Sequence, residues 1–155
     1  MNTLLRQLLA FWQTLTSTLD AARPLAALAA RAYLAEVFFR SGLTKLQDWD
    51  TTLLLFTEEY RVPLLPPAWA AVAGTAGELV LPVMLLLGLG GRFAALGLSV
   101  VNAVAVVSLA EIAPAALQQH ITWGVLLAAL ALFGVGRWSL DERVVGPQLQ
   151  RRLAG

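Results

Sequence analysis

The sequence predicts an all-α membrane protein, in which a four-helix transmembrane bundle follows an N-terminal amphipathic interfacial helix. Of the 155 residues, 58% are hydrophobic and 14% are charged, whereas charged residues make up about a quarter of a typical soluble domain. A surface with so few charges would not keep a small globule in solution. Four apolar segments long enough for helical spans occur along the chain, and four helices of about 20 residues account for most of it.

The counts of individual residue types exclude several classes of function. The formal net charge is +1, so we expect no nucleic-acid partner. There is no cysteine, which excludes thiol catalysis, disulfides and iron–sulfur ligation. His120 is the single histidine, so one chain cannot hold a bis-histidine haem. We therefore predict no metal and no cofactor held within the chain.

Residues 1–24 are predicted to lie in the membrane interface. Leucines and aromatic residues recur there at helical spacing, and polar residues fill the other face. The segment is too polar to span a bilayer, and Phe11 and Trp12 suit headgroup depth. A helix packed on the bundle itself is the alternative. Pro24 is expected to separate this helix from the next one, as a proline in a first turn would.

The membrane domain is predicted over residues 25–141, and a polar tail over 142–155. The four spans are expected at about 25–43, 68–89, 93–109 and 121–135. Between the first two lies a polar loop, in which Thr51 to Tyr60 can form a short helix with Asp50 as its N-cap and Pro63 beyond its end. Pro82 falls inside the second span, a position that membrane helices tolerate.

The distribution of lysine and arginine predicts that both termini lie in the cytoplasm, and the expected location is a bacterial inner membrane. Three of these residues, Arg40, Lys45 and Arg61, lie on the side of the loop between the first two spans. Seven lie on the side of the termini: Arg6, Arg23, Arg92, Arg137, Arg143, Arg151 and Arg152. Positively charged residues are in excess on the cytoplasmic side of membrane proteins.

Charged residues inside the predicted spans form the candidate site. Glu36 and Arg40 are four residues apart on one helix and can pair. At about 1.5 Å per residue, antiparallel packing brings Glu78 to the same layer, and Asn102 can approach it. A charge at this depth costs roughly 2.5–3.5 kcal/mol on insertion scales. Two interpretations stay open: the cluster fixes helix register, or it handles protons or a ligand head group beside a cavity.

Other polar residues have two interpretations each. Lys45, at the end of the first span, is expected to extend to the membrane surface as its default, or otherwise to join the site. Arg31 is expected to extend to the surface in the same way or to anchor a lipid phosphate, and Arg92 is assigned a structural or lipid-contact role. His120 is either a polar helix end or a donor to a quinone carbonyl, next to Trp123.

Four stretches of the chain resemble the DoxX family of small four-helix membrane proteins. In order, they are RAYLAEVFFRSGLTK (31–45), GELVLP (77–82), LGLGGR (87–92) and GVGRWSLD (134–141). The loop LFTEEYRVPLLP (55–66) looks like that of a bacterial subgroup. Positions typical of the family are Arg31, Gly42, Lys45, Glu78, Gly88, Arg92, Gly136 and Asp141. The chain departs from the pattern at Gly91, where a threonine is common.

The resemblance implies a function that composition does not show. The family takes its name from a subunit of a thiosulfate:quinone oxidoreductase, and other members are tied to thiol and oxidative-stress defence in membrane complexes. We therefore expect a membrane subunit of a redox or stress-response system, with a quinone-like site lined by Glu36, Arg40, Lys45, Glu78, Asn102 and His120. The absence of cysteine argues against thiol redox chemistry in this chain.

The chain is not expected to be an enzyme on its own, because a partner protein would have to supply the electrons. Its expected partners are the lipid bilayer and a membrane or peripheral redox protein, and a homo-oligomer is left open. The competing hypothesis is a non-enzymatic membrane protein: an anchor, an assembly factor or a small-solute carrier. The charged layer and Pro82 favour the carrier among these.

Overall fold

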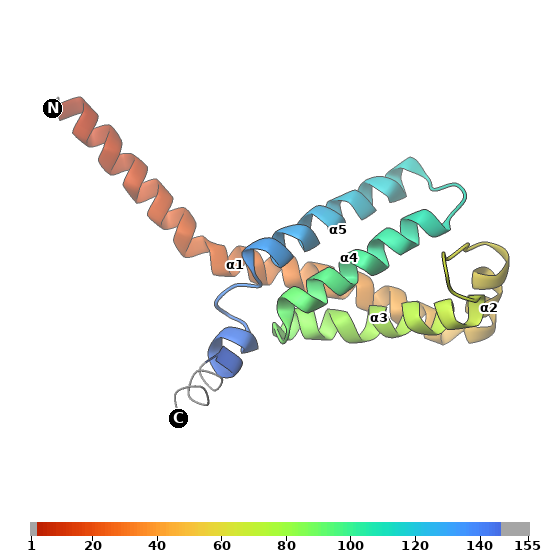
Figure 1. Cartoon of the computed structure of the whole chain (residues 1–155). Helices are drawn as coiled ribbons and strands as arrows, with labels where there is room; N and C mark the ends of the chain where they lie inside the picture. Colours follow the sequence, from red (N-terminus) through yellow and green to blue (C-terminus); the bar gives the residue numbers. More distant parts are fainter. Residues whose placement is uncertain (1–2, 147–155) are drawn as a thin grey trace.

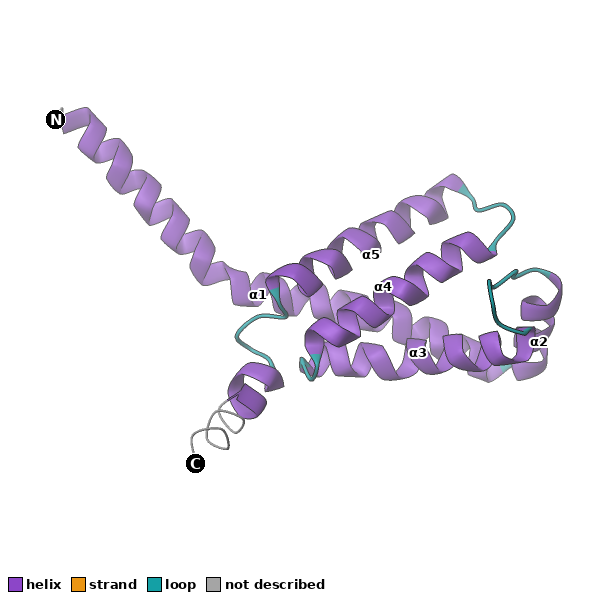
Figure 2. Cartoon of the chain, in the orientation of Figure 1, coloured by secondary structure: helices purple, strands orange, loops and turns teal. Residues whose placement is uncertain are grey.

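The computed structural model describes residues 3–146, and helices are the only regular elements among them (Figure 2). The elements are α1 (Thr3–Gln47), α2 (Trp49–Glu58), α3 (Pro67–Leu87), α4 (Gly91–Ser108), α5 (Pro114–Phe133) and a short π-helix, η1 (Asp141–Val145). The all-helical prediction is confirmed over this range. Arg151 and Arg152 of the predicted tail lie outside the described residues.

The bundle consists of α3, α4, α5 and the part of α1 that lies beside them (Figure 1). Neighbouring helices pack in the order α1–α3–α4–α5, and α1 also contacts α5. The largest buried side chains of the core include Leu34, Leu85, Leu98 and Leu127. The short helix α2 packs against α3 at one end of the bundle, where Phe56 covers Ala70 and Ala71.

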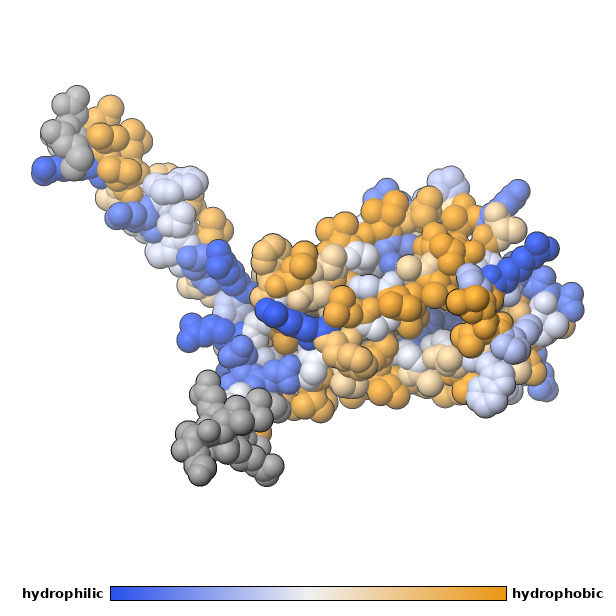
Figure 3. Space-filling view, in the orientation of Figure 1, coloured by the Kyte–Doolittle hydropathy of each residue, from blue (hydrophilic) through white to orange (hydrophobic). Residues whose placement is uncertain are grey.

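Within residues 3–146, three helices are long and apolar enough to cross a membrane: α3, α4 and α5. Hydrophobic residues cover much of the visible surface of the bundle (Figure 3). Val80, Val100 and Val125 are among its exposed side chains. An apolar outer surface is what a bilayer solvates, so the predicted lipid environment fits this architecture. The part of α1 within the bundle is more highly charged.

The predicted break at Pro24 is wrong, because α1 is one helix of 45 residues with Pro24 inside it. A proline in a helix interior removes one backbone hydrogen bond and bends the helix without always ending it. The N-terminal part of α1, residues 3–24, projects away from the bundle (Figure 1). We call it the arm. Its leucines and aromatic side chains are exposed, including Leu8 at 57% and Trp12 at 62%.

Two other predicted boundaries need correction. Asp48, rather than Asp50, caps α2, because its carboxylate accepts a hydrogen bond from the backbone N–H of Thr51 at 2.9 Å. The last long helix, α5, begins at Pro114 rather than Ile121. Proline is favoured in the first turn, where its missing N–H would have no helical partner. The helix therefore takes in Gln118, Gln119 and His120, which were expected in a turn or at a helix end.

Candidate functional site

A buried ion pair joins α1 to α3. Lys45 Nζ lies 2.5 Å from Glu78 Oε2 and donates a second hydrogen bond to Ser41 Oγ at 3.0 Å. The two charged side chains are only 20% and 10% exposed. The default prediction for Lys45, extension to the membrane surface, is therefore wrong. The carboxylate of Glu78 holds the ammonium group inside the bundle.

Close packing of α1 on α3 sets the position of this pair. A side chain at Gly42 would meet Leu79 at 2.9 Å and Cβ of Glu78 at 3.1 Å. Because Gly42 has no side chain, the two backbones approach closely at this level. Lys45 lies almost one turn further along α1, so its long side chain reaches Glu78.

A second polar pair joins α4 to α5. Asn102 Nδ2 donates to the backbone carbonyl of His120 at 2.9 Å, and Asn102 Oδ1 lies 2.7 Å from His120 Nδ1. With the amide oxygen as acceptor, Nδ1 carries the proton, and the neutral ring keeps its acceptor at Nε2. The His120 ring also packs edge-on against Trp123, with centroids 4.9 Å apart.

Lys45, Glu78 and His120 line one cavity of about 460 Å³, whereas Asn102 lies behind His120 and is not part of the wall. This volume is within the usual range for a small-molecule site, about 300–1,000 Å³. We call it the α2-end cavity, because Phe56 of α2 and Tyr60 of the following loop form part of its wall. The remaining wall is mainly apolar and includes Val37, Phe38, Ala73, Val101 and Val104. The cavity thus combines an apolar interior with Lys45, Glu78 and His120 as polar groups.

The loop after α2 is held against the end of α4. The backbone N–H of Arg61 donates to the carbonyl of Ser108 at 2.8 Å. Tyr60 packs edge-on against Phe56, with centroids 5.0 Å apart. Burial raises the pKa of the Tyr60 hydroxyl, and the nearby carboxylates of Glu59 and Glu78 raise it further. The hydroxyl therefore stays protonated beyond its ordinary range.

Glu36 and Arg40 do not join this site, which corrects the predicted four-residue cluster. Their predicted pairing is confirmed, with Arg40 Nη2 2.8 Å from Glu36 Oε1. Their side chains, however, are 60% and 77% exposed on the outer face of α1. The helical periodicity explains this, because Lys45 is more than two turns from Glu36 and on a different face. Asn102 is buried as a polar core residue, but it pairs with His120 rather than with a carboxylate.

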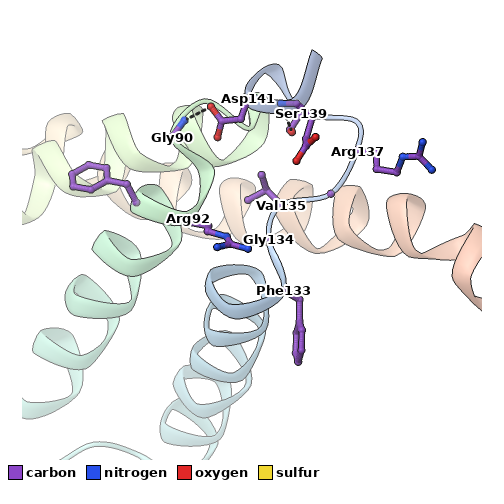
Figure 4. Close-up of a pocket in the computed structure, with 11 residues that line it drawn as sticks. Gly90, Arg92, Phe133, Gly134, Val135, Arg137, Ser139 and Asp141 are labelled. Atoms are coloured by element: carbon purple, nitrogen blue, oxygen red, sulfur yellow. Dashed lines mark hydrogen bonds between the residues drawn. The ribbon is translucent and has the colours of Figure 1, made fainter. Parts of the chain in front are cut away.

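A second cavity, of about 470 Å³, lies at the opposite end of the bundle (Figure 4). Arg92, Arg137 and Asp141 are among its lining residues, and Arg92 lies beside Gly134. The carboxylate of Asp141 accepts hydrogen bonds from the backbone N–H groups of Gly90 (2.9 Å) and Gly91 (2.8 Å). Asp141 therefore caps the N-terminus of α4 from a distant part of the chain.

Arg31 neither extends to the surface nor has access to a lipid phosphate. It is 1% exposed, and its Nη2 donates to the backbone carbonyl of Trp138 at 2.9 Å. Its Nη1 lies 2.7 Å from the position that a Cβ atom at Gly88 would occupy. Arg31 thus joins α1 to the loop before η1 and to the turn between α3 and α4.

Sequence reasoning missed Ser41, Phe56 and Tyr60 in the α2-end cavity and the capping role of Asp141. Ser41 had a usable signal, because it lies one helical turn before Lys45. Asp141 was noted only as a position typical of the family, and local spacing could not reveal its capping role because its hydrogen bonds join residues about 50 positions apart. Phe56 and Tyr60 enter the cavity through the fold of α2 onto α3, which periodicity does not reveal.

Apolar helices packed into a bundle, with ion-paired and hydrogen-bonded polar groups facing an internal cavity, define a helical membrane protein with a candidate small-molecule site. The family model for DoxX matches residues 26–111, more than half of the chain, and the chain belongs to the DoxX family. Searches of curated proteins and of solved structures found no match. Over residues 3–146, no cluster of three histidine, cysteine or acidic side chains suits a metal ion.

Proposed function

We propose that this chain is the membrane subunit of a redox or stress-response system, and that its α2-end cavity binds the head group of a quinone-like molecule. The buried Lys45–Glu78 pair in the wall of a mainly apolar cavity carries the proposal. Ionisable groups within membrane segments are expensive and commonly mark ligand or proton pathways. An amphipathic ligand from the bilayer suits this combination of apolar and charged surface.

The polar groups of the cavity offer complementary hydrogen bonds to both redox forms of such a ligand. A lysine ammonium has three donors, and Lys45 directs two of them to Ser41 and Glu78. The third can serve a quinone carbonyl. The hydroxyl groups of a quinol are donors, for which Glu78 and His120 Nε2 are acceptors. A partner redox protein supplies the electrons, and Glu78 and His120 exchange protons with the ligand.

The proposal includes a membrane topology. The part of α1 from residue 25 onward packs along α3 and serves as a fourth span, despite its charges. The excess of lysine and arginine on the side of the termini favours an orientation with both termini in the cytoplasm. A bacterial inner membrane is proposed from the resemblance of the loop at 55–66 to a bacterial subgroup of the family. The α2 end of the bundle, with its cavity, then faces the outer side.

Organic extraction of the purified protein tests the proposed ligand. The chain is purified in detergent from bacterial membranes, extracted with solvent and analysed for quinone by absorbance and mass spectrometry. We expect quinone in the wild type and in Val125→Ala, an exposed position on α5, and at least about tenfold less in Glu78→Gln. Extracts without quinone, or with equal amounts in all three proteins, would contradict the proposal. The chain would then be better described as a non-enzymatic anchor, assembly factor or small-solute carrier.

A further inference from the structure

The exposed Glu36–Arg40 pair lies near the middle of the bundle. On one side of Glu36, the Tyr33 hydroxyl accepts a hydrogen bond from Trp123 Nε1 at 3.1 Å, and on the other, Phe38 packs against the same ring. Trp123 is halfway along α5 (Pro114–Phe133). Beyond Arg40, Gly42 packs against Leu79, which is near the middle of α3 (Pro67–Leu87).

An ion pair at this depth does not suit a lipid-facing surface. Each charge costs roughly 2.5–3.5 kcal/mol at the centre of a spanning helix, and such residues almost always face protein or a water-filled cavity. Glu36 and Arg40 nonetheless point away from the bundle and from the α2-end cavity. In the membrane, another protein surface therefore has to cover this face of α1.

The spacing of exposed residues on α1 indicates what covers it. Alternating steps of four and three residues connect exposed positions along one face. These positions are Ala22, Ala26, Ala29, Tyr33, Glu36 and Arg40, which we call the α1 seam. The same alternation continues back along the arm through Leu19, Leu15 and Trp12. A sustained three–four alternation is the spacing by which one helix packs lengthwise against another in a coiled coil.

We infer that the α1 seam pairs with the α1 seam of a second copy of this chain, in a parallel dimer. The charge pattern is compatible with self-association, because in register the two Glu36 carboxylates form one layer and the two Arg40 guanidinium groups form the next layer one helical turn away, so that the four side chains make an electrically neutral cluster. All copies insert in the same orientation, so the seams run parallel. The three alanines allow close approach of the helices, and the arm extends the contact beyond the bundle.

Cysteine cross-linking tests the seam, since the natural chain contains no cysteine. Ala22→Cys and Ala29→Cys lie on the seam. Ala21→Cys is an exposed control one residue away, and Leu132→Cys is an exposed control on α5. After oxidation in native membranes, we expect a disulfide-linked species of twice the monomer mass from both seam variants and at least about fivefold less from both controls. Equal cross-linking at seam and control positions, or none on the seam, would overturn the inference.

A charge-swap experiment tests the identity of the partner. In a dimer of E36R, positions 36 and 40 of the two copies would bring four arginine side chains together. In a dimer of R40E, the same positions would bring four carboxylates together. Each variant combined with Ala29→Cys should show about tenfold less cross-linking than Ala29→Cys alone, because like charges face each other. Co-expression of the two should restore the cross-link between unlike copies, which also shows that both variants fold. Failure of this restoration, or unchanged cross-linking in each variant alone, would contradict a homodimer.

Discussion

The Lys45–Glu78 pair has both a structural role and a proposed role in ligand binding. Each charge is largely removed from water, so each depends on the other for stability. At the same time, both line the α2-end cavity, where a ligand can reach them. Their structural and functional roles can be separated, because a buried ion pair can often be replaced by apolar residues without loss of stability.

Substitutions at this pair should separate stability from ligand binding. Lys45→Met leaves the Glu78 carboxylate buried without its partner, which we expect to cost about 3–5 kcal/mol. The double variant Lys45→Met/Glu78→Leu should recover most of that stability but retain no quinone. Thermal unfolding in detergent and solvent extraction of the same samples measure the two properties. A double variant that still binds quinone would show that the pair is only structural.

Gly88 is a position at which both the backbone conformation and the surrounding side chains favour glycine. Its φ of +67° is unfavourable for other residues, and a side chain there would lie 2.4 Å from Cβ of Ser139. We expect Gly88→Ala to lower the free energy of unfolding by about 2–4 kcal/mol, from backbone strain and overpacking together. Gly90→Ala is the matched control, because its φ is +56° but its nearest neighbour is Met84 at 3.4 Å. Equal losses in thermal unfolding would refute the packing argument.

Among the elements, α4 depends on a cap supplied by the segment after α5. The two hydrogen bonds from Gly90 and Gly91 to Asp141 satisfy N–H groups that have no partner within the helix. Asp141→Ala should cost about 0.5–2 kcal/mol, the usual range for loss of an N-cap, and Asp141→Asn should cost less. Hydrogen exchange should become faster at the start of α4 and stay unchanged in α2. Unchanged exchange at Gly90 and Gly91 would contradict the capping role.

The segment after α2 should become less stable at alkaline pH. Burial raises the pKa of Tyr60 above 10.0, its ordinary value, so the unfolded chain loses this proton at a lower pH than the folded chain does. Stability is therefore complete below the ordinary pKa and falls as the pH rises through the raised one. We expect the melting temperature to fall in this range for the wild type and to fall less for Tyr60→Phe. Identical profiles would show that Tyr60 does not titrate in this way.

The elements also show how far sequence reasoning extends. Apolar length predicted α3 and α4 to within about two residues, because spanning a bilayer requires a continuous hydrophobic segment. Apolar length failed at Pro24, where a proline inside a helix resembles a helix boundary. It also failed at Ile121, because the polar first turns of α5 resemble a loop. Periodicity identified the Glu36–Arg40 pair but not its outward direction, since the sequence does not specify which face of α1 packs on α3. Tertiary packing, through Gly42, decides that Lys45 reaches Glu78.

At the scale of the whole molecule, the proposed orientation follows from the uneven distribution of lysine and arginine. The cytoplasmic location proposed for both termini predicts that a fluorescent protein fused after Gly155 is bright and that alkaline phosphatase fused there is inactive. A fusion in the loop after α2, at Leu64, should give the opposite result, since this residue is fully exposed between α2 and α3. Phosphatase activity from the C-terminal fusion would reverse the topology.

Quenching of Trp123 fluorescence tests the central claim most directly, because this side chain lines the α2-end cavity beside His120. The measurement uses a chain in which Trp12, Trp49, Trp69 and Trp138 are replaced by phenylalanine, titrated in detergent with a short-chain quinone. A bound quinone should quench the fluorescence saturably, and Glu78→Gln in the same background should weaken binding at least about tenfold. Linear, non-saturating quenching that is identical in both proteins would contradict a quinone site in this cavity.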